Sequence, residues 1–222
     1  MHLRSESIPV WLQESSLLVL CAIVLAVLLL APWRSVVASP QRVHLIAGGA
    51  ISCGLLWLLD IQLTEDITLH LLGMTALTLA VGGHFAILAG IAATLFFYLT
   101  KGLPFLGFGV SALSSVVVPV GVSLALLKAL QRPRFRNPFF FILGAGFAGG
   151  CLVTLIGALI LVALTQVLGV SLGLDDIDVL LPMLALVMFS EGFVDGMCVA
   201  ALAIFYPGWV KTFDERFYLE GN

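Results

Sequence analysis

Seven predominantly apolar segments follow one another along the chain, and most of them have the roughly 20 residues that a bilayer crossing requires. The segments are Ser16–Pro32, Val43–Leu59, Ile67–Val81, His84–Thr100, Phe108–Ala129, Pro138–Leu168 and Leu180–Tyr206. Only 10% of the 222 residues are charged and 61% are hydrophobic, whereas a soluble domain carries about 25% charged residues. The sequence therefore predicts an all-α integral membrane protein with about seven transmembrane helices.

The third and fourth segments are short and meet at Gly82–Gly83. They form either two separate crossings or a re-entrant pair, and the later topology is the same in both cases. We divide the chain into an extracytoplasmic segment (1–15), a seven-helix membrane domain (16–206) and a cytoplasmic tail (207–222). A cleaved signal peptide is the alternative for the first segment, but its apolar run is long and no A-x-A-like cleavage site follows it.

The basic residues gather in the loops on one side of the predicted bundle. Eight of the ten lie there: Arg34, Arg42, Lys128, Arg132, Arg134, Arg136, Lys211 and Arg216. Because Lys and Arg are retained in cytoplasmic loops, we expect the amino terminus outside and the carboxyl terminus in the cytoplasm. The outer loops are acidic, and five of their residues can raise the local cation concentration by electrostatic focusing or serve solubility alone: Glu65, Asp66, Asp175, Asp176 and Asp178.

Two carboxylates, Glu191 and Asp195, lie within the last apolar segment. An ionised carboxylate near the bilayer centre costs at least about 2.5 kcal/mol, so such groups are usually protonated, paired or next to water, and they often mark function. Residues four apart share one face of a helix. We therefore expect both carboxyl groups to point the same way and to share a proton.

Small residues repeat at intervals of four on the sixth segment. They are Gly146, Gly150, Thr154 and Ala158. This small-xxx-small pattern lets helices approach closely in lipid. It predicts close packing inside the bundle, with a face for a partner subunit as the alternative.

The amino-terminal Met1-His2 pair offers a free amine, an amide nitrogen and an imidazole nitrogen, which can chelate one metal ion in fused rings. A fourth nitrogen would complete a plane, and planar nitrogen sites favour Cu(II) or Ni(II). His70 is the only other histidine predicted on the same side, whereas His44 and His84 lie near the inner ends of their spans. The alternative is that His2 is an arbitrary second residue and His70 a structural one.

Three blocks of sequence resemble the CbiM/NikM family, the substrate-capturing permeases of energy-coupling factor (ECF) transporters for cobalt and nickel. The blocks are His70–Gly82, Leu106–Pro119 and Ser190–Met197, and the ending Pro207–Leu219 resembles a less characterised bacterial branch of this family. The resemblance covers about residues 40 to 219. Two positions depart from the family pattern: Leu3–Ser7 replaces an acidic, glycine-containing stretch, and Ser111 stands where the family has asparagine.

The resemblance implies seven helices around an inserted amino terminus, with the metal held by Met1, His2 and His70. It implies transport of Ni²⁺ or Co²⁺ across a bacterial inner (plasma) membrane, and the chelate chemistry adds Cu²⁺. The metal is cargo, so no resident cofactor is expected. No nucleic-acid partner and no enzymatic activity are expected.

The energy source is constrained by a missing motif. The sequence has no G-x-x-x-x-G-K-[ST] loop to cradle nucleotide phosphates, so ATP-driven uptake would require a separate ABC ATPase and a coupling membrane subunit. The alternative is a self-sufficient proton-coupled carrier of metal or another small solute, in which Glu191 and Asp195 relay protons. A membrane hydrolase using these carboxylates is a third hypothesis, but no H-E-x-x-H motif is present.

Overall fold

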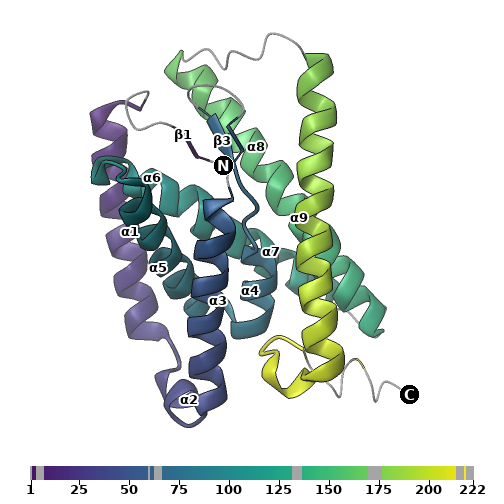
Figure 1. Ribbon diagram of the computed structural model, residues 1–222. Coiled ribbons are helices and arrows are strands. Elements are labelled where there is room, and N and C mark those ends of the chain that lie inside the picture. Colours follow the sequence, from purple (N-terminus) through teal and green to yellow (C-terminus); the bar gives the residue numbers. More distant parts are fainter. Residues whose placement is uncertain are drawn as a thin grey trace.

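The computed structural model of the protein describes residues 2–3, 8–59, 61–62, 67–131, 137–169, 177–213 and 218. Over these residues the chain is predominantly helical, which confirms the predicted helical class. The long helices run alongside one another, and the start of α1 (Val10–Leu30) and the end of α9 (Ile177–Phe205) lie at opposite ends of the bundle (Figure 1).

Five of the seven predicted spans correspond to helices that are long and apolar enough to cross a membrane. Within the described residues these are Val10–Leu30, Gly83–Lys101, Phe105–Leu130, Phe140–Leu168 and Leu181–Phe205. Large apolar side chains are exposed on their outer faces, including Leu30, Val167 and Phe205. Contiguous exposed apolar surface is rare on soluble monomers, so these helices support a membrane protein.

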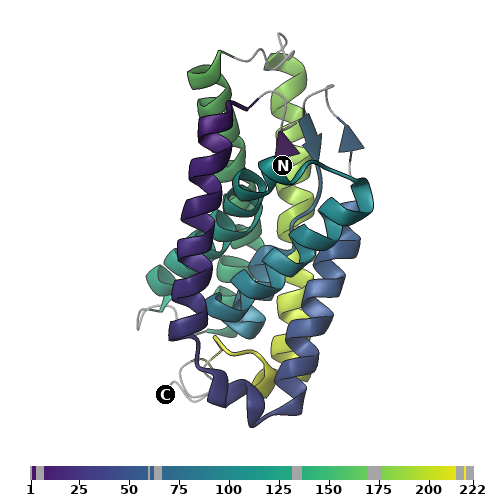
Figure 2. The same cartoon turned by 90° about the vertical axis from the view of Figure 1, so that its left-hand side faces the viewer.

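The first helices differ slightly from the predicted spans. α1 begins at Val10 rather than Ser16, because the apolar side chains Val10 and Trp11 directly follow Pro9. It lies along one side of the bundle (Figure 2). There a Cβ at Gly109 would come within 2.6 Å of the Leu17 backbone nitrogen, so the two segments approach closely.

A short turn separates α1 from the second long helix. α2 (Trp33–Val37) leads into α3 (Pro40–Leu58), which has 19 residues but is not among the five apolar spans. α3 carries Gln41, Arg42 and His44 near its start, which makes that end polar.

The expectation of a continuous helix over Ile67–Val81 is wrong. The chain instead forms strand β3 (Ile67–Leu69), a loop, and the eight-residue helix α4 (Met74–Val81). At 1.5 Å per residue α4 rises only about 12 Å, less than half of the roughly 30 Å hydrocarbon core. Gly73 precedes α4 with φ +65° and Gly82 follows it with φ +85°, conformations that favour glycine.

Two of the remaining spans contain wider, π-helical turns. The segments are α5 (Gly83–Lys101), η2 (Phe105–Gly107), α6 (Phe108–Ala112), the π-helical η3 (Leu113–Val117), α7 (Val118–Leu130), the π-helical η5 (Phe140–Ala148) and α8 (Gly149–Leu168). Pro119 lacks an N–H and would crowd the carbonyl four residues before it. The π turn of η3 lies at that carbonyl and relieves the conflict.

Glycines let η5 and α8 cross α9 closely. A Cβ at Gly150 would lie 2.9 Å from the Cα of Gly192, and one at Gly192 would lie 2.6 Å from the Phe147 carbonyl oxygen. A Cβ at Gly146 would lie 3.2 Å from Val199 Cβ. The predicted packing inside the bundle is therefore confirmed for Gly146 and Gly150.

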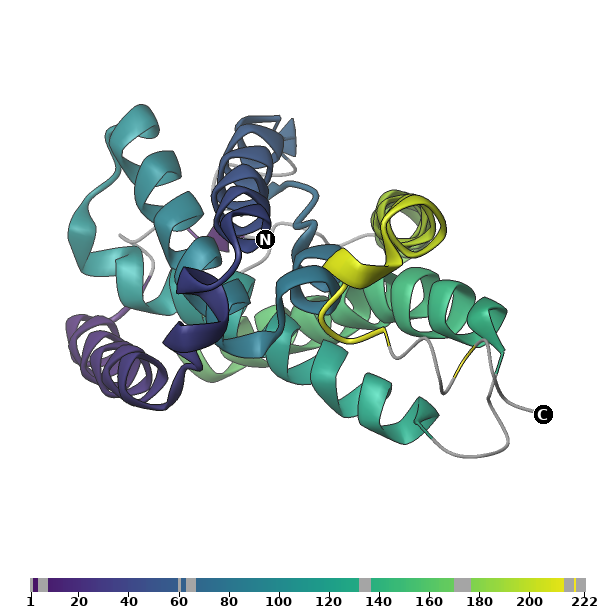
Figure 3. The ribbon, with the colours of Figure 1, turned by 90° about the horizontal axis from the view of Figure 1, so that it is seen from below.

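The segment after α9 returns to the end of α4. The Lys211 N–H donates to the Ala80 carbonyl at 2.8 Å, and the Thr212 hydroxyl donates to the Leu79 carbonyl at 2.6 Å. These bonds satisfy carbonyls that a helix leaves unpaired at its last turn. Seen from below, the turn that ends the bundle (yellow) lies beside α4 (Figure 3).

Candidate functional site

Glu191 and Asp195 reach from α9 to the amino-terminal end of α4. Glu191 Oε2 accepts a hydrogen bond from the Leu72 N–H at 2.7 Å, and Oε1 accepts one from the Gly73 N–H at 2.8 Å. Asp195 Oδ1 accepts one from the Ala76 N–H at 3.0 Å. The expectation that both carboxyl groups point the same way is confirmed.

These bonds give the two carboxylates a structural task. The bonds from Gly73 and Ala76 satisfy donors at the start of α4 that a helix leaves unpaired, at the end where the helix dipole favours negative charge, and the bond from Leu72 holds the loop before the helix. Glu191 is 2% exposed and Asp195 is 0% exposed. In a membrane interior an unsatisfied backbone group costs several kcal/mol, so the pair stabilises a half-length helix that would otherwise be unfavourable there.

His70 lies in the loop that these bonds hold, between β3 and α4. It is buried, and its ring centroid lies 5.4 Å from that of Trp57 and 5.9 Å from that of Phe97. Nδ1 lies 3.3 Å from the Leu71 carbonyl oxygen. Because a carbonyl only accepts, this contact favours the tautomer with the proton on Nδ1. Nε2 then carries the lone pair through which neutral imidazole binds a metal.

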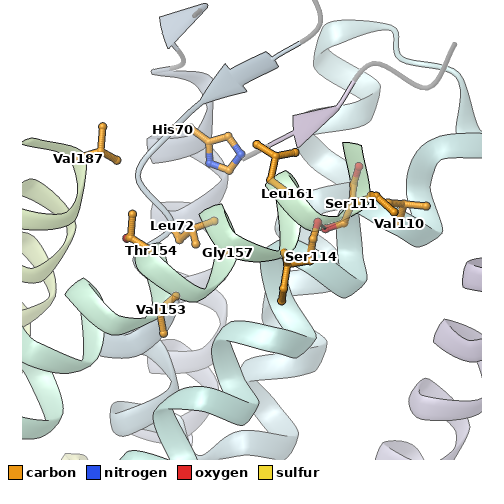
Figure 4. Close-up of a pocket in the computed structure, with 12 residues that line it drawn as sticks. His70, Leu72, Val110, Ser111, Ser114, Val153, Thr154, Gly157, Leu161 and Val187 are labelled. Carbon is orange, nitrogen blue, oxygen red and sulfur yellow. Dashed lines mark hydrogen bonds between the residues drawn. The ribbon is translucent and has the colours of Figure 1, made fainter. Parts of the chain in front are cut away.

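A small cavity adjoins His70. Its volume is about 50 Å³ and its lining includes His70, Ser111, Ser114 and Thr154, enough room for one or two water-sized groups. In Figure 4 the His70 ring points toward Leu161 of α8, and Ser111 and Ser114 lie beyond Leu161 on the same side of the ring. The Oγ of Ser111 lies 2.7 Å from the Tyr98 hydroxyl.

The amino-terminal strand lies beside this loop. β1 (His2–Leu3) pairs antiparallel with β3, with His2 opposite Thr68 and Leu3 opposite Ile67. β2 (Ile61–Gln62) pairs with the other edge of β3, so β3 is the central strand of a three-stranded sheet. The sequence did not predict this sheet. Its pairing places His2 opposite Thr68, two positions before His70.

Several predicted site residues lie outside the described residues. They are Met1, Glu65, Asp66, Asp175 and Asp176. Asp178 belongs to the first turn of α9, and the backbone of His2 forms β1. Within the described part of the chain, no three His, Cys, Asp or Glu side chains converge to hold a metal ion.

Trp57 is a positioning residue that the sequence did not single out. It is 1% exposed, and its Nε1–H donates to the Leu72 carbonyl at 2.9 Å. The loop is thereby held from two sides, by Trp57 on α3 and by Glu191 on α9. A tryptophan inside an apolar segment carries one N–H that needs an acceptor when buried. This need for an acceptor is the feature by which the sequence could have indicated a role for Trp57.

Comparison of the chain with models of protein families, with curated proteins and with solved structures found no match.

Proposed function

We propose that this chain is the substrate-capturing membrane component of an ECF-type ABC transporter for a divalent transition metal, Ni²⁺ or Co²⁺, or Cu²⁺. The pairing of β1 with β3 is the observation that carries this function. Isolated short strands contribute little stability, so a strand of two residues gains little for the fold by lying there. Its position next to the loop of His70 is the arrangement that a metal site built from the amino terminus needs.

The strand register supports shared coordination by His2 and His70. Directly opposite residues of an antiparallel pair lie on the same face, and diagonal neighbours lie about 7–8 Å apart. His2 is opposite Thr68, and His70 lies two residues later, directly after the end of β3. One metal ion with imidazole nitrogens at about 2 Å can bridge such a separation.

The environment of His70 supports metal binding at low entropic cost. Its ring is fixed between Trp57 and Phe97, and its backbone loop is fixed by Glu191. A ligand that is already oriented loses less freedom when the metal arrives. In this proposal the amine of Met1 supplies a further nitrogen to the site.

In this proposal the chain crosses the membrane seven times, with the amino terminus outside. The third pass consists of β3, the His70 loop and α4, and irregular backbone is tolerated at membrane depth where it is buried in protein. Every residue of α4 is buried. Arg42, His84 and Lys211 line one hollow, which supports a shared basic, cytoplasmic end. Transport would then require separate ATPase and coupling membrane subunits.

Metal content tests this function. Protein purified with an unmodified amino terminus, checked by intact mass, is loaded with Ni²⁺ or Co²⁺, desalted and analysed for bound metal. The native chain should retain about one ion, because the chelate and His70 form one site. His2→Ala, His70→Ala and a chain extended by one residue before Met1 should each lose the ion while remaining monodisperse.

His84→Ala is the matched control, since His84 lines the hollow at the basic end of the bundle and should leave the metal content unchanged. Full metal retention by the extended chain would exclude the amino-terminal site. Loss of metal from His84→Ala would instead indicate nonspecific binding by surface histidines.

A further inference from the structure

A groove of about 510 Å³ runs between α3 and α9, and α4 forms its floor. His44, Gly48 and Ser52 on α3 line one wall at intervals of four, which puts them on one helix face. All three are exposed, and a Cβ at Gly48 would meet nothing within 4 Å. Cys198 and Leu202 on α9 line the other wall. The groove therefore opens sideways toward the lipid.

One end of the groove is polar and basic. Two smaller hollows of about 60 and 90 Å³ adjoin it, and all three share Leu45 and Trp209. Arg42 lines both of the smaller hollows and Lys211 lines one. Among the described residues, no acidic side chain lines either of them. Trp209 is 41% exposed, as is usual for tryptophan at a membrane surface.

We propose that the groove binds an anionic phospholipid, with one acyl chain between α3 and α9 and the phosphate headgroup at Arg42 and Lys211. Charge complementarity selects the headgroup, because basic pockets between helices on the cytoplasmic side attract anionic lipids. The apolar lining of the groove binds the acyl chain of the lipid.

The lining of the groove favours an acyl chain. From residue 44 to residue 56, α3 rises about 18 Å, and along this length the lining residues are mostly small or apolar, including Gly48, Ala76 and Leu202. An extended hydrocarbon chain fits along such a groove, with its headgroup at the basic end.

The bound lipid would contact α4 directly. Gly73, Ala76 and Ala80 form part of the floor, and α4 is the helix that follows the His70 loop. Asp195 lies at the deep wall of the groove, where Oδ1 binds the Ala76 N–H and Oδ2 faces Gly150. A lipid in this groove would therefore stabilise the position of α4 from the bilayer side, whether or not the chain carries metal.

Native mass spectrometry and thermal unfolding of the full chain test this site, with dioleoyl phosphatidylglycerol and dioleoyl phosphatidylcholine as probes. The native chain should retain one phosphatidylglycerol and gain several degrees in Tm with it. The double variant Arg42→Gln/Lys211→Gln should lose about tenfold or more in phosphatidylglycerol affinity. Arg34→Gln removes a charge from the exposed turn α2, outside the three hollows, and should bind like the native chain.

The acyl site is tested by filling the groove. Gly48→Phe and, independently, Ser52→Phe should abolish binding of both lipids. Gly121→Phe is the matched control, since its Cβ also meets nothing within 4 Å, and it should have no effect. Equal retention of the two lipids by the native chain would overturn the headgroup assignment. Lipid retention by a folded, groove-filled variant would overturn the lipid site. If such a variant retained lipid but no longer bound a coupling subunit, the groove would be assigned to a helix of that partner.

Discussion

Glu191 Oε1 lies 2.8 Å from the Gly73 N–H, a hydrogen bond that joins α9 to the start of α4 across 118 residues of sequence. At the other end of α4, Thr212 binds the Leu79 carbonyl across 133 residues. Both ends of this half-length helix are thus capped by the last part of the chain. Because α4 follows the loop of His70, the candidate metal site and the segment after α9 are connected through one short, fully buried helix.

Glu191→Lys should greatly reduce the amount of folded protein in the membrane. A lysine cannot accept hydrogen bonds, so the Leu72 and Gly73 N–H groups would lose their acceptor and a positive charge would face the positive end of α4. Glu191→Gln is the matched control, because the glutamine carbonyl still accepts a hydrogen bond. It should lower the free energy of unfolding by only about 1–2 kcal/mol. Membrane accumulation and size-exclusion profiles of fluorescent fusions measure both, and equal accumulation of the lysine variant would contradict the buried placement.

Thr212→Val should lower the free energy of unfolding by about 1 kcal/mol, because it removes one hydroxyl hydrogen bond while retaining the shape of the side chain. For a chain of this length the expected decrease in Tm is about 2–4 °C. Thr100→Val is the control, since the Thr100 hydroxyl bonds to Phe96 within its own helix at an exposed position. A decrease no larger than that of the control would indicate that the bond to Leu79 contributes nothing.

The sequence predicted the features that rest on local composition. Apolar length predicted five spans that the structure contains, and the four-residue spacing of Glu191 and Asp195 predicted their common direction. The spacing of Gly146 and Gly150 likewise predicted a close helix crossing. Each of these signals lies within a single helix, where periodicity alone determines which residues share a face.

The sequence did not predict the interruption before α4, because the groups that stabilise it are distant in sequence. Residues 67–81 are apolar enough for a span, but Glu191 and Trp57 bind the backbone of the loop. The β1–β3 pair and the Lys211 bond to Ala80 are backbone contacts. Backbone contacts of one or two residues produce no side-chain period that a sequence could reveal.

Gly192→Ala should destabilise the protein by about 1–3 kcal/mol, as overpacking of a filled core does. The new methyl would lie 2.5 Å from Cys151 Sγ and 2.6 Å from the Phe147 carbonyl oxygen, and the latter is backbone that cannot rotate away. Gly121→Ala is the control, because nothing lies within 4 Å of its Cβ, and it should be neutral or slightly stabilising through helix propensity. Thermal unfolding in detergent measures both, and similar Tm values would refute close packing of η5 and α8 against α9.

Affinity for Ni²⁺ should fall as the pH decreases below about 6.5, where free imidazole gains a proton, because metal ligands must be deprotonated to bind. Protons and metal compete for the same nitrogens, so the loss should be reversible and should appear in the dissociation constant rather than in the fold. Isothermal titration between about pH 5 and pH 8, with circular dichroism at each pH, distinguishes a loss of metal affinity from a loss of fold. An affinity that does not change over this range would exclude imidazole and amine ligands.

Reporter fusions should place residue 66 outside the cell and residue 222 in the cytoplasm. Eight of the ten basic residues lie in the loops assigned to the cytoplasm, and such residues are retained there during insertion. A phosphatase fused after Asp66 should be active, whereas one fused after Arg134 or Asn222 should be inactive and a fluorescent reporter at the latter two positions should mature. Phosphatase and fluorescence assays on whole cells measure this pattern. The reverse pattern would put the amino terminus and His70 at the cytoplasmic end, where a site for capturing external metal has no use.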